Sequence, residues 1–131
     1  MTSTLVDSNV LIDLLDSPGE TGTWSSKRIE EAGNDGKVVL SPIVLAEISI
    51  GFDDLLELDR LLSRVGFTRE TLPWEAAFKA GKAHADYRRR GGVRDRTLPD
   101  FLIGAHAVVK GHHLLTRDPR RYRSYFRSYL P

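Results

Sequence analysis

Short apolar runs alternate with segments of helical periodicity along nearly the whole chain, and this alternation restricts the fold more than any other feature. Residues 4–6, 38–40, 65–68 and 113–115 have the length and composition of strands. Segments with the apolar spacing of helices separate them. Because a parallel connection needs a long crossover, strands that alternate with helices form a mainly parallel sheet covered by helices. We therefore predict a three-layer α/β fold with a mainly parallel sheet of about four to five strands.

The helices are predicted from apolar spacing and from start and stop residues. Their expected ranges are 10–15, 24–32, 42–50, 55–62, 74–90 and 99–110. Pro42 and Pro99 stand at first helical positions, where a missing N–H costs nothing. In the helix at 74–90 the apolar side is expected to carry Trp74, Ala77, Phe78 and Ala85. The last ten residues fit either a helix or a final edge strand.

Length and composition narrow the class of protein. The 131 residues are expected to form a single domain, residues 1–131, which is large enough to fold without disulfides or a structural metal. Cysteine is absent, which excludes disulfides and thiolate sites and fits a reducing compartment. The N-terminal run lacks early positive charge and contains Asp7 and Asp13, so it is a poor signal peptide. No apolar run approaches the roughly 20 residues of a membrane span. We expect a cytoplasmic protein without a membrane partner.

Charge is distributed unevenly between the two parts of the chain. Residues 1–78 hold 6 Lys and Arg against 14 Asp and Glu, whereas residues 79–131 hold 13 against 4. A basic C-terminal part suggests a polyanionic partner, although a solvated charged surface explains the same asymmetry.

Four acidic residues stand where a parallel α/β sheet collects its functional groups, outside the carboxyl ends of the strands. Asp7 follows the first strand and Asp118 lies just past the fourth, while Asp100 is in the first turn of its helix. Glu47 shares a helix face with Ile43 and Ile50 at spacings of four and three, so it is expected to point toward the sheet. Each acid alone has an ordinary structural explanation. Together they would repel one another, and a divalent cation such as Mg²⁺ or Mn²⁺ removes that conflict.

Four motifs in order resemble one known family. VDSNVLIDLL, SPIVLAEIS, LPDFLIGAHA and LLTRDPRRY are similar to segments of PIN-domain ribonucleases, and among these to the VapC-type toxins of toxin–antitoxin pairs. The resemblance covers nearly the whole chain and implies a PIN-like parallel sheet flanked by helices. It also implies Mg²⁺- or Mn²⁺-dependent hydrolysis of RNA by an attacking water.

The resemblance assigns roles to particular residues. It implies that Asp7, Glu47, Asp100 and Asp118 are catalytic, that Asp7, Asp100 and Asp118 hold the metal, and that Asn9 and Thr116 orient the acids from a second shell. The arginines expected to contact RNA phosphates are Arg88, Arg89, Arg90, Arg94, Arg96, Arg117, Arg120, Arg121 and Arg123. For Arg117 there is an alternative, in which it braces the loop against another acid.

The resemblance also implies protein partners. A toxin must be silenced in its own cell, so a small antitoxin is expected in a groove formed by the helix at 24–32 and the helices around 43–62. It would send a basic side chain toward Asp7 and Asp100. A homodimer is expected as well.

Other classes fit the sequence less well. A receiver-like signalling domain needs an aspartate after its third strand, where Arg69 stands, and a dinucleotide-binding module needs glycines where Ser8 and Asn9 follow the first strand. A non-toxin or non-cleaving PIN-like module that binds RNA or protein is the remaining alternative. We interpret the histidines as packing or surface residues without a convergent ligand set; they are His84, His106, His112 and His113.

Overall fold

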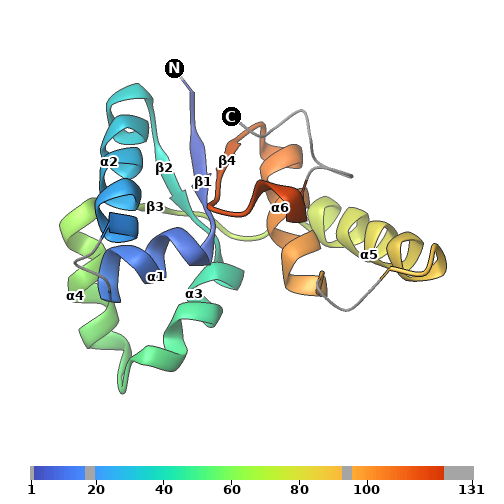
Figure 1. The fold of residues 1–131 in the computed structure, drawn as a ribbon, viewed down its shortest axis with the longest axis horizontal. Helices are drawn as coiled ribbons and strands as arrows, with labels where there is room; N and C mark the ends of the chain where they lie inside the picture. Colours follow the sequence, from blue (N-terminus) through green and yellow to red (C-terminus); the bar gives the residue numbers. More distant parts are fainter. Residues whose placement is uncertain (1, 17–19, 93–95, 123–131) are drawn as a thin grey trace.

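A computed structural model describes residues 2–16, 20–92 and 96–122 of the chain (Figure 1). Four strands form one sheet in the order β3-β2-β1-β4, and every neighbouring pair is parallel. The strands are β1 (Thr4–Val6), β2 (Val38–Leu40), β3 (Thr68–Arg69) and β4 (His113–Leu115). This confirms the predicted α/β class and the mainly parallel sheet.

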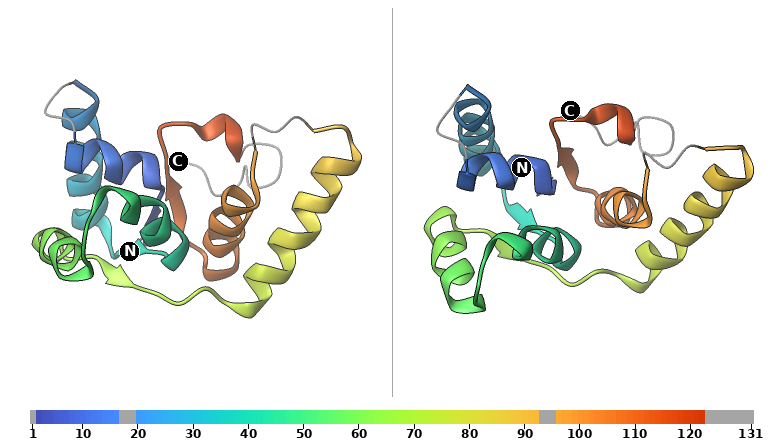
Figure 2. Two further views of the ribbon diagram at one scale, coloured as in Figure 1. Left: turned by 90° about the horizontal axis from the view of Figure 1, so that it is seen from below. Right: turned by 60° about the horizontal axis from the view of Figure 1, so that its bottom comes forward.

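Six α-helices of the described residues surround this sheet. They are α1 (Ser8–Asp16), α2 (Glu20–Asp35), α3 (Pro42–Ile48), α4 (Leu55–Val65), α5 (Trp74–Arg89) and α6 (Leu98–Lys110). Two 3₁₀ turns complete the set, η1 (Ser49–Gly51) and η2 (Pro119–Arg121). In Figures 1 and 2, α5 forms one end of the molecule and lies beside α6, while α2 and α4 lie at the other end. None of the described helices is long and apolar enough to cross a membrane.

The central strands carry the core and bring two chain segments together. Leu5 of β1 is paired in register with Val39 of β2 and Leu114 of β4, and these three side chains are fully or almost fully buried. The backbone N–H of Asp7 donates to the carbonyl of Leu115 at 2.9 Å. Because β1 and β4 are parallel neighbours, the residues that follow them emerge side by side at one edge of the sheet.

Local signals in the sequence account for several helix ends. The side chain of Ser41 accepts a hydrogen bond from the N–H of Ile43 at 3.1 Å, and Pro42 occupies the first turn of α3. The carboxylate of Asp54 caps α4 by accepting from the N–H of Glu57 at 2.8 Å. These caps satisfy N–H groups that have no partner within the helix.

Three sequence predictions need correction. The third strand lies at Thr68–Arg69 and not at 65–68, because α4 continues to Val65 and ends at Gly66, whose φ of 79° belongs to the left-handed region that favours glycine. The helix predicted at 42–50 ends at Ile48, so Ile50 lies in η1 and is 92% exposed. Glu47 therefore does not share an inward face with Ile50.

The third correction concerns the apolar side of α5. Trp74 and Phe78 were expected to be buried, yet they are 92% and 67% exposed, whereas Ala76 and Ala80 are fully buried. Small side chains at the contact let α5 pack closely on α6, and the large apolar ones remain on the outside.

Candidate active site

Asp7 is a buried carboxylate held by three donors. It lies between β1 and α1 and is only 3% exposed. Its Oδ1 accepts from the N–H of Ser8 at 2.8 Å, and its Oδ2 accepts from the Thr116 hydroxyl at 2.8 Å and from the Tyr122 hydroxyl at 2.9 Å. These bonds leave Asp7 in one orientation at the edge of the sheet.

Thr116 joins the start of α1 to the loop after β4. Its hydroxyl donates to Asp7 and accepts from the Asn9 side-chain amide at 3.2 Å and from the N–H of Asp118 at 3.0 Å. Asn9 in turn accepts from the N–H of Arg117 at 3.2 Å. The structure thus brings Asn9 and Thr116 to Asp7, where the sequence analysis expected them to act.

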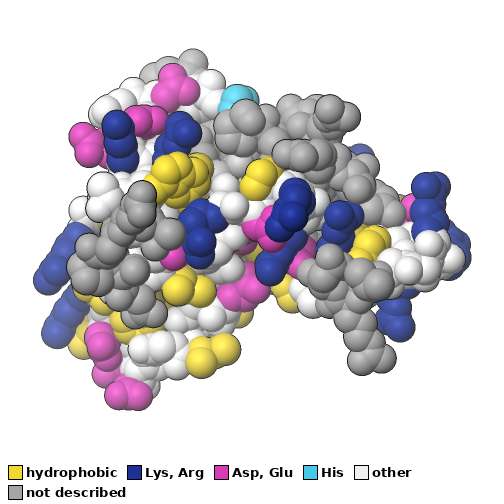
Figure 3. Space-filling view, in the orientation of Figure 1, with side chains coloured by type: hydrophobic (Ala, Val, Ile, Leu, Met, Phe, Trp, Pro, Cys, Tyr) yellow, Lys and Arg dark blue, Asp and Glu magenta, His cyan; other side chains and the backbone are white. Residues whose placement is uncertain are grey.

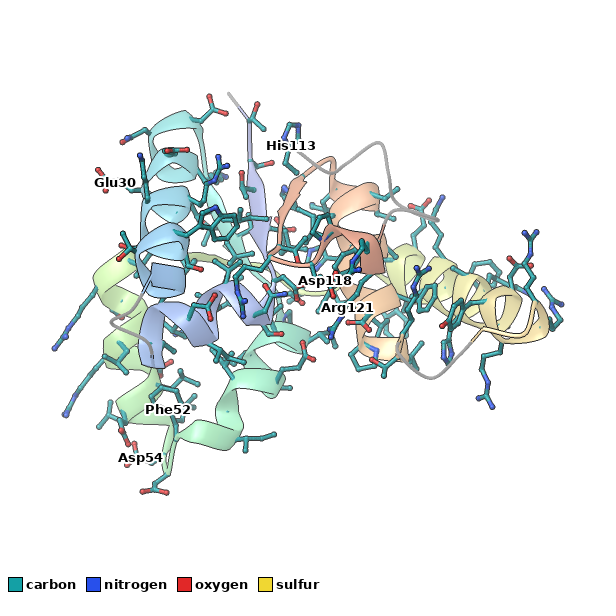
Figure 4. The ribbon with its side chains drawn as sticks, in the orientation of Figure 1. Glu30, Phe52, Asp54, His113, Asp118 and Arg121 are labelled. Atoms are coloured by element: carbon teal, nitrogen blue, oxygen red, sulfur yellow. The ribbon has the colours of Figure 1, made fainter. Side chains whose placement is uncertain are left out.

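Asp100 caps α6 from its first turn. One carboxylate oxygen accepts from the N–H of Thr97 at 3.0 Å and from its hydroxyl at 3.3 Å. The other oxygen lies 3.6 Å from the guanidinium of Arg121, whose Nε donates to Asp118 at 3.1 Å. Figure 4 shows Asp118 and Arg121 next to each other near the middle of this face. Arg121 therefore bridges two of the four predicted acids.

Glu47 is the fourth acid and projects from α3. It accepts a hydrogen bond from the Ser8 side chain. Within the described part of the chain its Oε1 is buried and has no hydrogen-bond partner. A buried carboxylate oxygen without a donor is costly, which indicates that something absent from the protein chain belongs there.

Burial and mutual repulsion shape the charges of this site. Burial raises the pKa of Asp7, its three hydrogen bonds lower it, and the charge of Asp100 raises it further. Burial also raises the pKa of Glu47, the bond from Ser8 lowers it, and the charges of Asp7 and Asp100 add to the increase. Asp7 and Glu47 thus lie near enough to Asp100 for its charge to oppose their ionisation.

Arg121 offsets part of this repulsion. Burial by itself lowers the pKa of Arg121, but Asp100, Asp118 and Asp7 outweigh it, so the pKa is raised. Burial, followed by the charge of Asp7, raises the pKa of Tyr122, which stays protonated and can serve as a donor. Arg120 also lies 3.6 Å from Asp118, so two guanidinium groups face four carboxylates and an excess of negative charge remains.

The donor set fits a hard divalent cation. All four predicted acids offer oxygen atoms, which suit Mg²⁺ and Mn²⁺. Oε1 of Glu47 has no hydrogen-bond partner among the described residues, and the pKa values of Glu47 and Asp7 are raised. A bound cation would supply a partner for this oxygen and would favour the ionised form of both acids.

Sequence reasoning missed several contacts around these acids. Tyr122 is a fully buried donor to Asp7, and no local pattern pairs residues that are 115 positions apart. Arg117 forms an ion pair with Asp13, whose Oδ2 also accepts from Ser25 at 3.0 Å. The bracing contact considered for Arg117 is therefore present, and its partner is Asp13.

The histidines also need a correction. His106 and His112 do have a convergent partner, because both face the carboxylate of Glu70. This cluster lies apart from the four acids. No spacing pattern in the sequence relates these residues, because Glu70 is 36 positions away from His106.

Apart from Arg117, six of the predicted RNA-contacting arginines lie in the described residues, and they form three groups. Arg96, Arg120 and Arg121 line a hollow of about 440 Å³ beside Asp118, and Figure 3 shows basic and acidic side chains together near the middle of this face. Arg88 lines a neighbouring hollow that Arg96 shares. The other arginines at the end of α5 pair with Asp86; they are Arg89 and Arg90. The remaining two, Arg94 and Arg123, lie outside the described residues.

Fold and site together define a class of protein. It is a parallel α/β domain that gathers carboxylates at the carboxyl edge of its sheet and is suited to a hard divalent cation. The chain belongs to the PIN domain family, whose family model matches residues 4–126. A search of curated protein sequences finds no significant match.

Solved structures share the fold over nearly the whole chain. A VapBC2 complex of Rickettsia felis bound to a promoter DNA fragment matches with a TM-score of 0.74 and 18% identity, covering 94% of this chain and 92% of that one. DNA-bound VapBC from Salmonella typhimurium matches with a TM-score of 0.69 and 22% identity, covering 94% and 92%. VapC20 of Mycobacterium tuberculosis, described as a toxin that cleaves the sarcin–ricin loop, matches with a TM-score of 0.69 and 16% identity, covering 98% and 99%.

Proposed function

We propose that this protein is a ribonuclease that hydrolyses RNA phosphodiester bonds with the help of Mg²⁺ or Mn²⁺. The observation that carries the proposal is the unpartnered, buried Oε1 of Glu47 beside Asp7 and Asp100, whose charges oppose the ionisation of Glu47. Membership of the PIN domain family supports the same activity.

Each side chain of the site has a role in this proposal. Asp7, Asp100 and Asp118 would hold the cation, which when bound would supply a water of lowered pKa and offset charge on the phosphoryl group. Glu47, whose pKa is raised by burial, accepts or donates a proton near the reacting atoms. Thr116 fixes Asp7 and Asp118 relative to each other, and Asn9 holds Thr116. The role of the protein chain is to orient these groups before RNA arrives.

RNA binding is assigned to the basic side chains around Asp118. Arg96, Arg120 and Arg121 line the same hollow as this acid, so a phosphate entering the hollow meets cations beside the proposed metal. Arg88 extends this surface toward α5. Arg117 contributes less directly, since it is paired with Asp13.

We also propose that the ribonuclease is the toxin of a toxin–antitoxin pair. The VapBC structures from Rickettsia felis and Salmonella typhimurium support this role through their shared fold. A groove of about 570 Å³, lined mainly by apolar residues, suits a short antitoxin segment. It is lined from α1 and from residues 47–61, and not from the helix at 24–32 that was predicted to form one side. Its lining includes Glu47 together with Ile12, Leu15, Ile48, Ile50, Phe52 and Leu61. An antitoxin lying there can extend a basic side chain to the acids.

A cleavage assay on RNA with Mg²⁺, with Mn²⁺ and with excess EDTA tests the activity. We expect cleavage that is lost in EDTA and in the Asp100→Asn protein, which keeps nearly the same volume but loses a metal-binding charge. Asp54→Asn is the matched control, because Asp54 also caps a helix but lies outside the site, and asparagine caps equally well.

Full activity of Asp100→Asn, or full activity in EDTA, contradicts the proposal. RNA binding without cleavage under all metal conditions would instead support the non-cleaving module considered from the sequence.

A further inference from the structure

A second group of ligating side chains lies outside the acidic site. Glu70 follows β3, His106 belongs to α6, and His112 lies between α6 and β4. The Nε2 atoms of both histidines are 2.8 Å from the same oxygen, Oε1 of Glu70. All three ligand atoms lie within 4.8 Å of one another. Two distant parts of the chain, residue 70 and residues 106–112, thus present metal-ligating atoms to one point.

This cluster is separate from the proposed catalytic centre. His106 follows Asp100 by six residues on α6, which places it about 9 Å along the axis and roughly 240° around the helix. His112 immediately precedes β4, and its Nδ1 is 2.6 Å from the hydroxyl of Ser3, which precedes β1. Asp7 follows the carboxyl end of β1, so the length of this three-residue strand separates it from Ser3 and His112. Glu70 follows β3, and β2 lies between that strand and β1.

The two histidines share Glu70 on the Nε2 side but differ on the Nδ1 side. If both histidines donate from Nε2 to Glu70, each must leave Nδ1 as an acceptor. His112 then receives the Ser3 hydroxyl, but Nδ1 of His106 is buried without a partner among the described residues. The His106 side chain is 0% exposed, so water does not reach it from the surface.

We propose that Glu70, His106 and His112 bind a transition-metal ion, with zinc as the best fit. Two imidazole nitrogens and one carboxylate oxygen are a common zinc ligand set, and imidazole favours zinc over Mg²⁺. The cation would lie between Glu70 and the two Nε2 atoms, with water as the fourth ligand. Glu70 is the most exposed of the three at 23%, which leaves a side from which the ion can enter.

The surroundings of His112 favour this role. When Nδ1–H of His112 donates to the Ser3 hydroxyl, the lone pair of Nε2 points at Glu70 and His106. Histidines that bind metals are commonly oriented by such a hydrogen bond from the other ring nitrogen. Ser3 and His112 also lie beside each other through the backbone, since the N–H of His113 donates to the carbonyl of Ser3 at 2.9 Å. The orientation of this ring is therefore set by the sheet.

A metal here would act on the fold and not on the reaction. Figure 2 shows that the segment after β3 crosses the molecule to reach α5 and passes α6 on the way. Glu70 is in this segment, so an ion bound to it and to the two histidines fastens the connection to α6 and to the start of β4. Zinc should then stabilise the protein whether or not the acidic site is intact.

The test uses the full chain, stripped of metal, with Zn²⁺ and Co²⁺ as probes. The Asp100→Asn protein serves as background because it weakens the acidic site. We expect one zinc per chain by calorimetry, a higher Tm with zinc, and the strong visible absorption of four-coordinate Co²⁺. Mg²⁺ should produce none of these effects.

Two variants assign the site, with a neighbouring histidine as control. Glu70→Gln and His112→Asn should each weaken zinc binding at least about tenfold. Changes to residues that only hold a metal ligand in place already cost about tenfold to a hundredfold in affinity. His113→Asn should have no effect, since His113 is exposed and outside the cluster. Circular dichroism checks that each variant is folded.

Two results overturn the proposal. One is the absence of zinc binding and of the Co²⁺ spectrum in the Asp100→Asn background, which needs no change to the cluster itself. The other is unchanged affinity in both Glu70→Gln and His112→Asn. RNA cleavage does not enter the test, so its result is independent of the proposed nuclease activity.

Discussion

The hydroxyl of Thr116 is the single atom on which the geometry of the acidic site depends most. It donates to Asp7 and accepts from Asn9 and from the N–H of Asp118. Thr116→Val replaces the hydroxyl by a methyl group of similar size, so the packing is kept while all three hydrogen bonds are lost. The threonine is buried, which limits the water that can replace them.

The loss of stability expected for Thr116→Val follows from the hydrogen-bond partners of the Thr116 hydroxyl. A hydrogen bond to an ionised group contributes about 1.5–3 kcal/mol, and a neutral one about 0.5–1.5 kcal/mol. Asn9 and Asp118 are only partly buried and can turn to water, so their bonds contribute at the low end. We expect the free energy of unfolding at neutral pH to fall by about 2–4 kcal/mol.

The effect should depend on pH, with a definite sign. The pKa of Asp7 is raised in the folded protein, chiefly by burial, so the folded state binds its proton more tightly than the unfolded state does. Below the unfolded pKa of 3.8, Asp7 is protonated in both states, so the burial of its charge costs nothing. As the pH rises from there through the folded pKa, the unfolded state loses its proton first and the free energy of unfolding falls. Removing a donor raises that pKa further. The variant should thus differ from the parent least in acid, where the lost bonds to Asn9 and Asp118 still count, and most at neutral pH.

Urea denaturation of the metal-free proteins at several pH values measures this. Thr68→Val is the matched control, because Thr68 is an exposed strand residue far from the acids. Tyr122→Phe removes the second donor to the same oxygen of Asp7, so the double variant should show coupling between the two changes. A loss that is equal at every pH, or no loss at all, would refute the argument that Thr116 stabilises the ionised form of Asp7. In the cleavage assay, the acid limb of the pH–rate profile should move to higher pH.

Three further predictions concern charge and assembly. Arg121→Gln removes a cation that contacts two of the acids, so Mg²⁺ or Mn²⁺ should bind more tightly, on the order of fivefold, by calorimetry; unchanged affinity would mean that the guanidinium is well screened. In an Asp100→Asn background, Arg120→Ala should reduce the salt dependence of RNA binding by about one phosphate contact, a log–log slope change of roughly 0.7 on a single strand, whereas Arg60→Ala should not. A homodimer would cover the exposed Trp74 and Phe78, so serine at both positions should give a monomer by light scattering; a parent protein that is already monomeric would contradict this.

The sequence by itself was sufficient for the order of the elements and for the place of the acids. Alternating strand and helix patterns imply a parallel sheet, and in such a sheet the residues that follow neighbouring strands meet at one edge. Asp7 and Asp118 could therefore be expected at one edge of the sheet, whereas Thr116 was assigned to Asp7 only by the family resemblance. The pairing of β1 with β4, which joins residues 109 positions apart, came from the structure. Asp100 could be located from the sequence because Pro99 marks the start of its helix. A carboxylate in the first turn of a helix can cap that helix and can also serve the site.

Only the tertiary structure decided which side chains meet across elements that no local rule relates. Tyr122 reaches Asp7, Arg121 lies between Asp100 and Asp118, and Glu70 meets the two histidines. Periodicity gives the face of a helix but not the neighbour against which it packs. In α5 both faces carry apolar residues, and close contact with α6 selected the alanines for the interior and left the aromatic residues outside. Contacts of this kind depend on the distance and crossing of packed helices, which are set by the volumes of all the side chains between them and not by any one segment.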